Sequence, residues 1–218
     1  MSINKKSISD LLRNPVGFRI RFLLLAGILL CFYSCASTAA VREGQLYVWL
    51  ADNAKYILLP PENIKNSMDG YQLVSVSFDG RDYDISSWVK ADETGIDMTL
   101  INELGTTMGE LSYNGGAVSF SSSVFPKSIR GEYIVADFQL CFYDALALRH
   151  ALEACGLSFT LSGSGHSSGD GSPRENAETG RRVFQGETLI IEIEKNRNVV
   201  RVINYLRGYS YTLEGNFQ

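Results

Sequence analysis

Hydrophobic and polar residues alternate along two neighbouring segments, 71–78 and 81–86, as they do in strands with one buried face. Asp79-Gly80 separates the two segments and is typical of a two-residue hairpin turn. The residues that this alternation places on the apolar face are Val74, Val76, Phe78, Tyr83 and Ile85. The pattern therefore predicts an antiparallel strand pair.

The same alternation continues in GIDMTLI, residues 95–101, where Met98 and Leu100 share a face. A second hairpin is predicted around Asn114-Gly115, because this dipeptide favours a tight turn. Its arms carry Leu111, Tyr113, Val118 and Phe120. Five strands in succession predict an antiparallel meander.

The periodicity becomes helical after Pro126. Ser128 is a candidate cap for a short helix that ends near Asp137. A clearer helix is predicted over 144–155, with Asp144 as N-cap and Gly156 as the left-handed stop. Its apolar stripe consists of Ala145, Leu148, Leu152 and Cys155.

Residues 162–180 are rich in glycine, serine and glutamate, which predicts a flexible surface loop. Strand patterns return in ETLIIEIEK (187–195), and one or two more strands are expected from Asn198 to Gly215. The order of strands, helices and strands predicts an α+β domain with its helices against one face of an antiparallel sheet.

The first 34 residues have the pattern of a bacterial lipoprotein signal peptide. Arg19 and Arg21 precede the apolar run Phe22–Tyr33, and Cys35 follows the small residue Ser34. We expect a signal peptide over 1–34, acylation of Cys35, a lipidated tether over 35–44, and a folded domain over 45–218. Two alternatives stay open: a membrane-spanning helix, since no charge occurs over 22–41, and plain secretion.

Charge excludes one class of partner. The whole chain carries a net charge of −4, and the basic leader contributes +4, so everything after Cys35 carries −8. Nucleic-acid binding needs clustered Lys and Arg to neutralise phosphates, and no such cluster is present. We therefore expect no nucleic-acid partner.

The candidate catalytic motifs favour a protein without enzymatic activity. GHSSG (165–169) fits the serine-hydrolase pattern with Ser167 as nucleophile, but the following GDGSPRENAETG does not predict the required helix. His150 is the other histidine, and it lies off the apolar stripe of the predicted helix. Two histidines without a close cysteine pair predict no zinc site, and no cofactor fingerprint occurs.

Cys141 and Cys155 invite a disulfide in an exported protein. If residues 144–155 are helical, the helix separates its ends by about 16 Å. Bridged cysteines need Cα atoms within about 7 Å. The two thiols are therefore expected to stay free, with Cys155 packed at a helix end.

Four segments resemble a family of bacterial outer-membrane lipoproteins of unknown function, whose genes accompany aryl-polyene pigment biosynthesis. They are LLPPENI (58–64), LSYNGGAVSF (111–120), IRGEYIVADFQLCFYDALALRHAL (129–152) and GRRVF (180–184). That family is similar in fold to the LolA/LolB carriers and receptors of lipoprotein transport. The resemblance, which spans roughly residues 45–213, implies a curved antiparallel half-barrel with helices on its concave face and an apolar cavity for acyl chains.

The resemblance also implies a function. It predicts a lipoprotein on the periplasmic face of a diderm outer membrane that binds or helps insert lipidic cargo, either a lipoprotein or an aryl-polyene lipid. A LolA-like carrier would be its partner. The residues expected to line the cargo cavity are Val74, Val76, Phe78, Tyr83, Ile85, Met98, Leu100, Val118 and Phe120 of the meander, with Leu148 and Leu152 as a lid.

Two questions stay open from sequence. The same apolar residues would equally form a dry, fully packed core. The alternative function is a non-catalytic scaffold lipoprotein that holds an envelope protein through its acidic surface and an exposed edge strand near the C-terminus, where Tyr209 and Tyr211 lie.

Overall fold

The computed structural model describes residues 44–217, apart from 79, 124, 126, 128 and 164–177. The predicted signal peptide, the Cys35 anchor, the tether up to residue 43, and Ser167 therefore lie outside the described residues. No helix in the described part has the length and hydrophobicity needed to cross a membrane.

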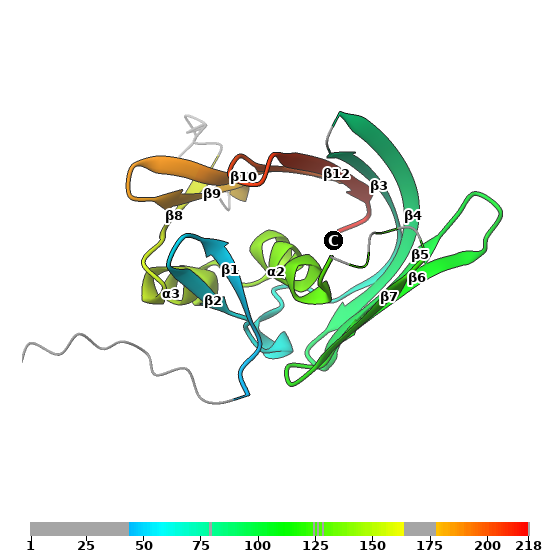
Figure 1. The fold of residues 1–218 in the computed structure, drawn as a ribbon, viewed down its shortest axis with the longest axis horizontal. Helices are drawn as coiled ribbons and strands as arrows, with labels where there is room; N and C mark the ends of the chain where they lie inside the picture. The colour runs from blue at the N-terminus through cyan, green and yellow to red at the C-terminus, as the bar shows by residue number, and fades with distance from the viewer. Residues whose placement is uncertain are drawn as a thin grey trace, which may run out of the picture. The chain divides into compact units, whose positions relative to one another are not determined.

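The domain is an α+β fold built on one antiparallel sheet of ten strands, with the order β7-β6-β5-β4-β3-β12-β11-β10-β9-β8. The first meander consists of β3 (Met68–Phe78), β4 (Arg81–Asp92), β5 (Gly95–Ile101), β6 (Thr107–Tyr113) and β7 (Val118–Ser122). The second meander consists of β8 (Ser158–Gly163), β9 (Glu178–Gln185), β10 (Thr188–Asn196), β11 (Val199–Asn204) and β12 (Tyr209–Gly215). The pairing of β12 with β3 joins the two meanders into one curved sheet (Figure 1).

Two helices connect the meanders along the chain. Helix α2 (Gly131–Phe142) lies on the concave side of the sheet, and α3 (Ala145–Ala154) packs against β8. A separate hairpin, β1 (Tyr47–Ala51) and β2 (Ala54–Ile57), contacts both helices, and the 3-10 turn η1 (Pro61–Asn63) follows it. The expected fold class, a curved antiparallel half-barrel with helices on its concave face, is confirmed.

The predicted five-strand meander is confirmed strand by strand. Phe78 pairs with Arg81, so the β3–β4 connection contains two residues, and its Gly80 has a φ of +70°. The second hairpin has a longer loop than predicted, because Tyr113 pairs with Val118. Asn114 accepts hydrogen bonds from the backbone N–H groups of Gly116 and Ala117 with its side-chain oxygen, which stabilises a four-residue turn.

The helix predictions were right for α3 and too short for α2. Asp144 caps α3 by accepting two backbone hydrogen bonds, and Gly156 follows its end with a φ of +83°. Helix α2 continues to Phe142, five residues beyond Asp137, because the chain keeps burying apolar side chains there. A Cβ atom at Gly131 would approach the Phe120 Cβ to 2.6 Å, so this glycine lets the start of α2 rest on β7.

One expectation about the C-terminus was wrong. The last strand, β12, is not an edge strand, because it pairs with β11 on one side and β3 on the other. The edges of the sheet are β7 and β8. Strand β9 was also missed, since it begins at Glu178, inside the predicted loop 162–180, and β8 extends into that loop as far as Gly163.

A set of buried and partly buried hydrogen bonds around Leu59 connects three parts of the fold. The side-chain oxygen of Gln139 on α2 accepts from the Leu59 N–H and from the Tyr56 hydroxyl, both at 3.0 Å. The Gln139 amide nitrogen donates to the Leu59 carbonyl at 2.7 Å, and the Tyr113 hydroxyl donates to the same carbonyl at 2.8 Å. This network joins α2 to the β1–β2 hairpin and to the first meander.

We predict that Gln139→Leu lowers the free energy of unfolding by about 2–4 kcal/mol, since it leaves the Leu59 N–H and the buried Tyr56 hydroxyl without their shared acceptor. Urea denaturation followed by circular dichroism measures the change. Glu153→Gln, on the exposed side of α3, is the control and should stay within about 0.5 kcal/mol of the parent. An equally stable Gln139→Leu protein would contradict the central role of this network.

Candidate functional site

The concave face of the first meander carries the residues predicted to line a cavity. Cross-strand pairing places Val74 opposite Ile85 and Val76 opposite Tyr83. On the neighbouring strands Met98, Leu111 and Phe120 form one row, and Tyr113 faces Val118. The Phe78 side chain is outside the described residues. The alternation therefore identified the correct face of the sheet.

Burial along this face decreases from one end to the other. On β4, Ala91 and Val89 are 0% and 2% exposed, Ile85 is 8% exposed, and Tyr83 at the far end is 42% exposed. On β5, Ile96 is fully buried, whereas Met98 and Leu100 are partly exposed. We call the partly exposed part next to the β3–β4 turn the open end, which includes Val76 and Tyr83.

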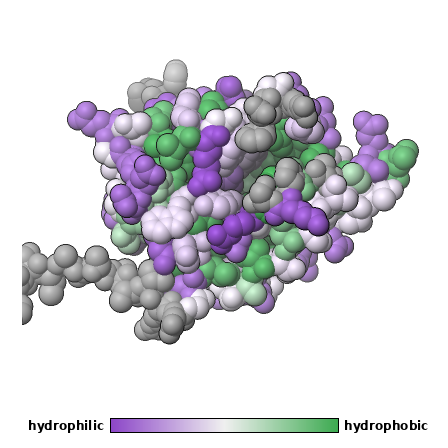
Figure 2. All heavy atoms as spheres, viewed as in Figure 1, coloured by the Kyte–Doolittle hydropathy of each residue, from purple (hydrophilic) through white to green (hydrophobic). Residues whose placement is uncertain are grey.

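The gradient has a simple geometric cause. Helix α2 has 12 residues and is about 18 Å long, whereas the 12 residues of β4 extend over about 40 Å. One short helix cannot cover such strands along their whole length. In Figure 2 the surface is hollowed between α2 and the arc of β12, β3 and β4, and hydrophobic residues line the hollow.

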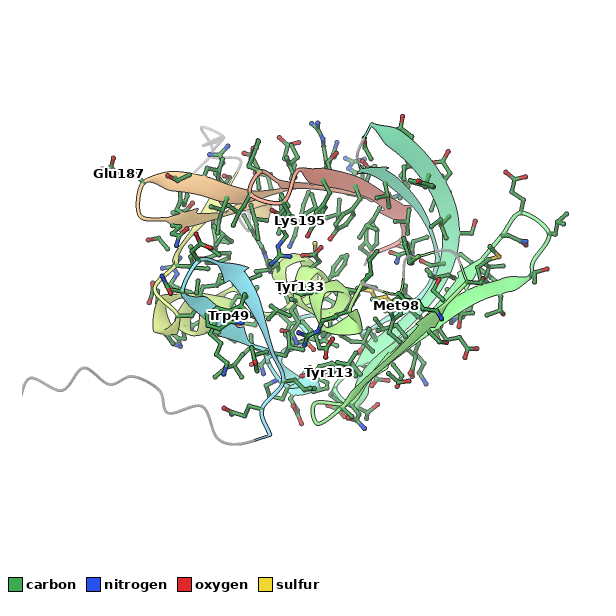
Figure 3. All side chains as sticks on the ribbon, viewed as in Figure 1. Trp49, Met98, Tyr113, Tyr133, Glu187 and Lys195 are labelled. Atoms are coloured by element: carbon green, nitrogen blue, oxygen red, sulfur yellow. The ribbon has the colours of Figure 1, made fainter. Side chains whose placement is uncertain are left out.

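The predicted lid is not where the sequence placed it. Leu148 and Leu152 are fully buried, but α3, which carries them, packs against β8 and β2. The helix that contacts the first meander is α2, through β7. Figure 3 shows side chains of the concave face, Met98 and Lys195 among them, on the side of the sheet that faces α2.

The polar residues of this interior were not among the predicted cavity residues. Ser87 lies between Gln72 and Leu100 in the cross-strand pairing, and it is 1% exposed. Its hydroxyl has no hydrogen-bond partner among the described residues. Buried hydroxyls are normally paired, so this one is an exception that a purely apolar packed core does not explain. The sequence did contain a signal for Ser87, because period-two alternation places it on the same face of the strand as Ile85 and Val89.

A second polar group lies where α2 meets β12. The Tyr209 hydroxyl donates to the Asp137 carboxylate at 2.7 Å and accepts from the Asn204 amide at 3.2 Å. Burial raises the pKa of Asp137 to about 6, although the Tyr209 hydrogen bond and the nearby Arg207 act in the opposite direction. Burial, together with the Asp137 charge, also raises the pKa of Tyr209 well above its usual range.

Two further contacts hold α2 against the second meander. The buried Arg181 guanidinium donates to the Leu140 carbonyl at 2.9 Å. The Cys141 thiol lies 3.9 Å from the Tyr211 hydroxyl, and burial raises the pKa of this thiol to about 12. Both Cys141 and Cys155 are free. Cys141 is thus a packed side chain with little thiolate character.

The residues considered for catalysis do not form a site in the described part of the chain. His150 is exposed on α3, and Ser167 lies outside the described residues. Among the residues that the structure describes, no group of three or more His, Cys, Asp or Glu side chains is placed to hold a metal ion.

Comparison with known families gives one decisive match. The family model described as protein of unknown function, DUF3261, matches residues 69–215, about two thirds of the chain. This chain belongs to the DUF3261 family. The match runs from β3 to β12 and so includes both meanders and both helices. No curated protein matches the chain significantly.

Among solved structures, the chain is similar to a DUF1329 family protein from Desulfovibrio piger ATCC 29098. The two are 11% identical over 71% of this chain and 86% of that one, with a TM-score of 0.31. A likeness this distant carries no argument about function.

The raised pKa of Asp137 gives a prediction for stability. A carboxyl whose pKa is higher in the folded than in the unfolded state stabilises the fold below about pH 4 and loses this contribution as pH rises through about 6. Asp137→Asn removes this titration. From pH 4 to pH 7.5, the free energy of unfolding of the variant should therefore rise by about 1–2 kcal/mol relative to that of the parent, a value reduced for the partial exposure of Asp137.

Urea denaturation at the two pH values measures this difference. Asp69→Asn, on the outer face of β3, is the matched control and should leave the pH dependence of the parent unchanged. If Asp137→Asn shows the same pH dependence as the parent, Asp137 is charged and well solvated in the folded protein.

Proposed function

We propose that this DUF3261 protein is a lipid-anchored envelope protein that binds or helps insert lipidic cargo, with the open end of the concave face as the cargo site. The observation that carries the proposal is the burial gradient from Ala91 to Tyr83. Apolar residues on a half-covered inner face gain about 0.8 kcal/mol for each ligand methylene that they shield from water. An acyl or polyene chain is therefore the ligand class that this surface favours.

The buried Ser87 hydroxyl gives further support. A cargo chain that carries a carbonyl or hydroxyl group offers the partner that this side chain lacks among the described residues. The adjoining Asp137–Tyr209 pair provides a polar boundary to the apolar surface. The proposed role is binding and transfer, without bond-breaking chemistry.

The proposed setting is the periplasmic face of a diderm outer membrane, where Cys35 would be the acylated anchor. It is supported by the leader sequence and by the resemblance to aryl-polyene-associated lipoproteins. A LolA-like carrier would deliver the cargo. The scaffold alternative loses its main support, because β12 has both edges paired and is unavailable for strand addition.

The anchor has a direct test. We expect the protein extracted from membranes to lack residues 1–34 and to carry the mass of two or three acyl chains on Cys35, because one chain alone binds a membrane only marginally. Intact mass spectrometry measures both features. Retention of the leader, or an unmodified Cys35, would contradict the proposed anchor.

The cargo site is tested with cis-parinaric acid, a fluorescent polyene fatty acid, and membrane-extracted protein held in an amphipathic polymer. Val76→Trp fills the open end with a large side chain, so we expect it to weaken binding about tenfold or more, the equivalent of losing a few buried methylenes. Native mass spectrometry of the parent should show co-purified lipid.

Ser77→Trp is the matched control, since it adds the same side chain to the next position of β3, which faces outward. It should bind cis-parinaric acid as the parent does. A parent protein without bound lipid or fatty-acid binding would show that the interior is a packed core. Equal losses in both variants would mean that tryptophan perturbs β3 rather than the site.

A further inference from the structure

The outer face of the first meander carries a straight row of five side chains. Tyr71 pairs with Trp88, Trp88 with Thr99, Thr99 with Glu110, and Glu110 with Ser121. Five strands at a spacing of about 4.8 Å give the row a length of about 19 Å. The row lies on the opposite face of the sheet from the cargo site, and we call it the outer-face row.

One end of the row is an exposed aromatic pair. Tyr71 is 66% exposed and Trp88 is 37% exposed, and their ring centroids are 4.6 Å apart at an interplanar angle of 86°. The edge-to-face contact holds the two rings in place. Because they stand on the surface of a regular sheet, the rings form a fixed and solvent-exposed platform.

The other end of the row is a polar depression of about 270 Å³. The depression is lined by Asp97, Met98, Thr99, Glu110, Leu111, Ser112, Ser119 and Ser121. The carboxylates and hydroxyls in this set make no hydrogen bond or ion pair with the described residues, so they are available to an external ligand. Asp97 and Glu110 lie on adjacent strands and on the same face of the sheet, where Asp97 pairs with Ser112 and Glu110 pairs with Thr99.

We propose that the outer-face row binds a glycan of neutral or amino sugars. The C–H groups on one face of a pyranose ring pack against the electron-rich face of an aromatic ring, as Tyr71 and Trp88 present it. Carboxylates accept hydrogen bonds from adjacent sugar hydroxyls more strongly than neutral groups do, which assigns Asp97 and Glu110 to the next sugar units. The length of the row suits a short oligosaccharide.

Charge selects among glycans. Asp97 and Glu110 repel anionic sugars such as uronic acids, whereas the ammonium group of glucosamine is attracted. The neighbouring row contains one cation, Lys90, which faces Asp97. The acidic end of the row therefore favours a glucosamine oligomer over a neutral one, and a neutral one over an anionic one.

The chemistry of the row distinguishes a glycan from a protein partner. The fully buried centre of a protein–protein interface is depleted of charged residues and is more apolar than the rest of the protein surface. In the outer-face row only the Tyr71 and Trp88 end is apolar, and the depression beside it contains two carboxylates and several hydroxyls. A sugar satisfies both ends, because each sugar ring has an apolar face and a hydroxyl-bearing edge.

The experiment uses the membrane-extracted, polymer-held protein and isothermal titration calorimetry with three tetramers: glucosamine, N-acetylglucosamine and galacturonic acid. We expect glucosamine to bind most tightly, N-acetylglucosamine more weakly, and galacturonic acid not at all. Tyr71→Ala should weaken binding of both amino sugars about tenfold. Glu110→Gln should weaken glucosamine binding more than N-acetylglucosamine binding, because it removes a charge.

Tyr205→Ala removes an exposed tyrosine from the β11–β12 turn and is the matched control, with binding expected to equal that of the parent. Tyr71 and Glu110 are exposed, so both variants should keep the circular dichroism and unfolding midpoint of the parent. Absence of binding to all three tetramers, preference for galacturonic acid, or equal binding by Tyr71→Ala would overturn the proposal. Crosslinking that captures a protein through Tyr71, without sugar binding, would also overturn it.

Discussion

The hydrogen bonds between Gln139 and the backbone of Leu59 hold this domain together. Helix α2 has to stay on the concave face of a sheet whose two halves come from opposite ends of the folded chain. The amide of Gln139 is well suited to this, because it donates and accepts at once and pairs with both backbone groups of one residue. Tyr113 reaches the same carbonyl from β6, so hairpin, helix and first meander meet at one point.

The second meander is attached to the same helix by different chemistry. Arg181 donates to the carbonyl of Leu140, one residue after Gln139, and Tyr209 donates to Asp137. Buried polar contacts of this kind cost more when broken than apolar contacts of similar area, so they define one position of α2 relative to both meanders. The segments 58–64, 111–120, 129–152 and 180–184, which carry the family resemblance, contribute Leu59, Tyr113, Gln139 and Arg181 respectively.

The position of α2 also accounts for the candidate cargo site. A helix of 12 residues leaves the far ends of β3 and β4 uncovered, and Val76 and Tyr83 lie there on the concave face. The sheet can thus present an apolar surface inside the curve. Its outer face is chemically different, since aromatic, hydroxyl and carboxylate side chains follow one cross-strand row there.

The local structure and the two faces of the first meander could be predicted from the order of the residues alone. Period-two alternation identified β3 to β7, and the capping chemistry of Asp144 and Gly156 identified α3, because both signals depend on neighbouring residues. The place of β12 between β3 and β11 was decided only by the tertiary structure, since strand order depends on pairing between segments far apart in sequence. The same holds for the exposure of Tyr83, the unpaired hydroxyl of Ser87 and the row from Tyr71 to Ser121. Burial and cross-strand neighbours are properties of the assembled sheet, and alternation along one strand carries no information about where a covering helix ends.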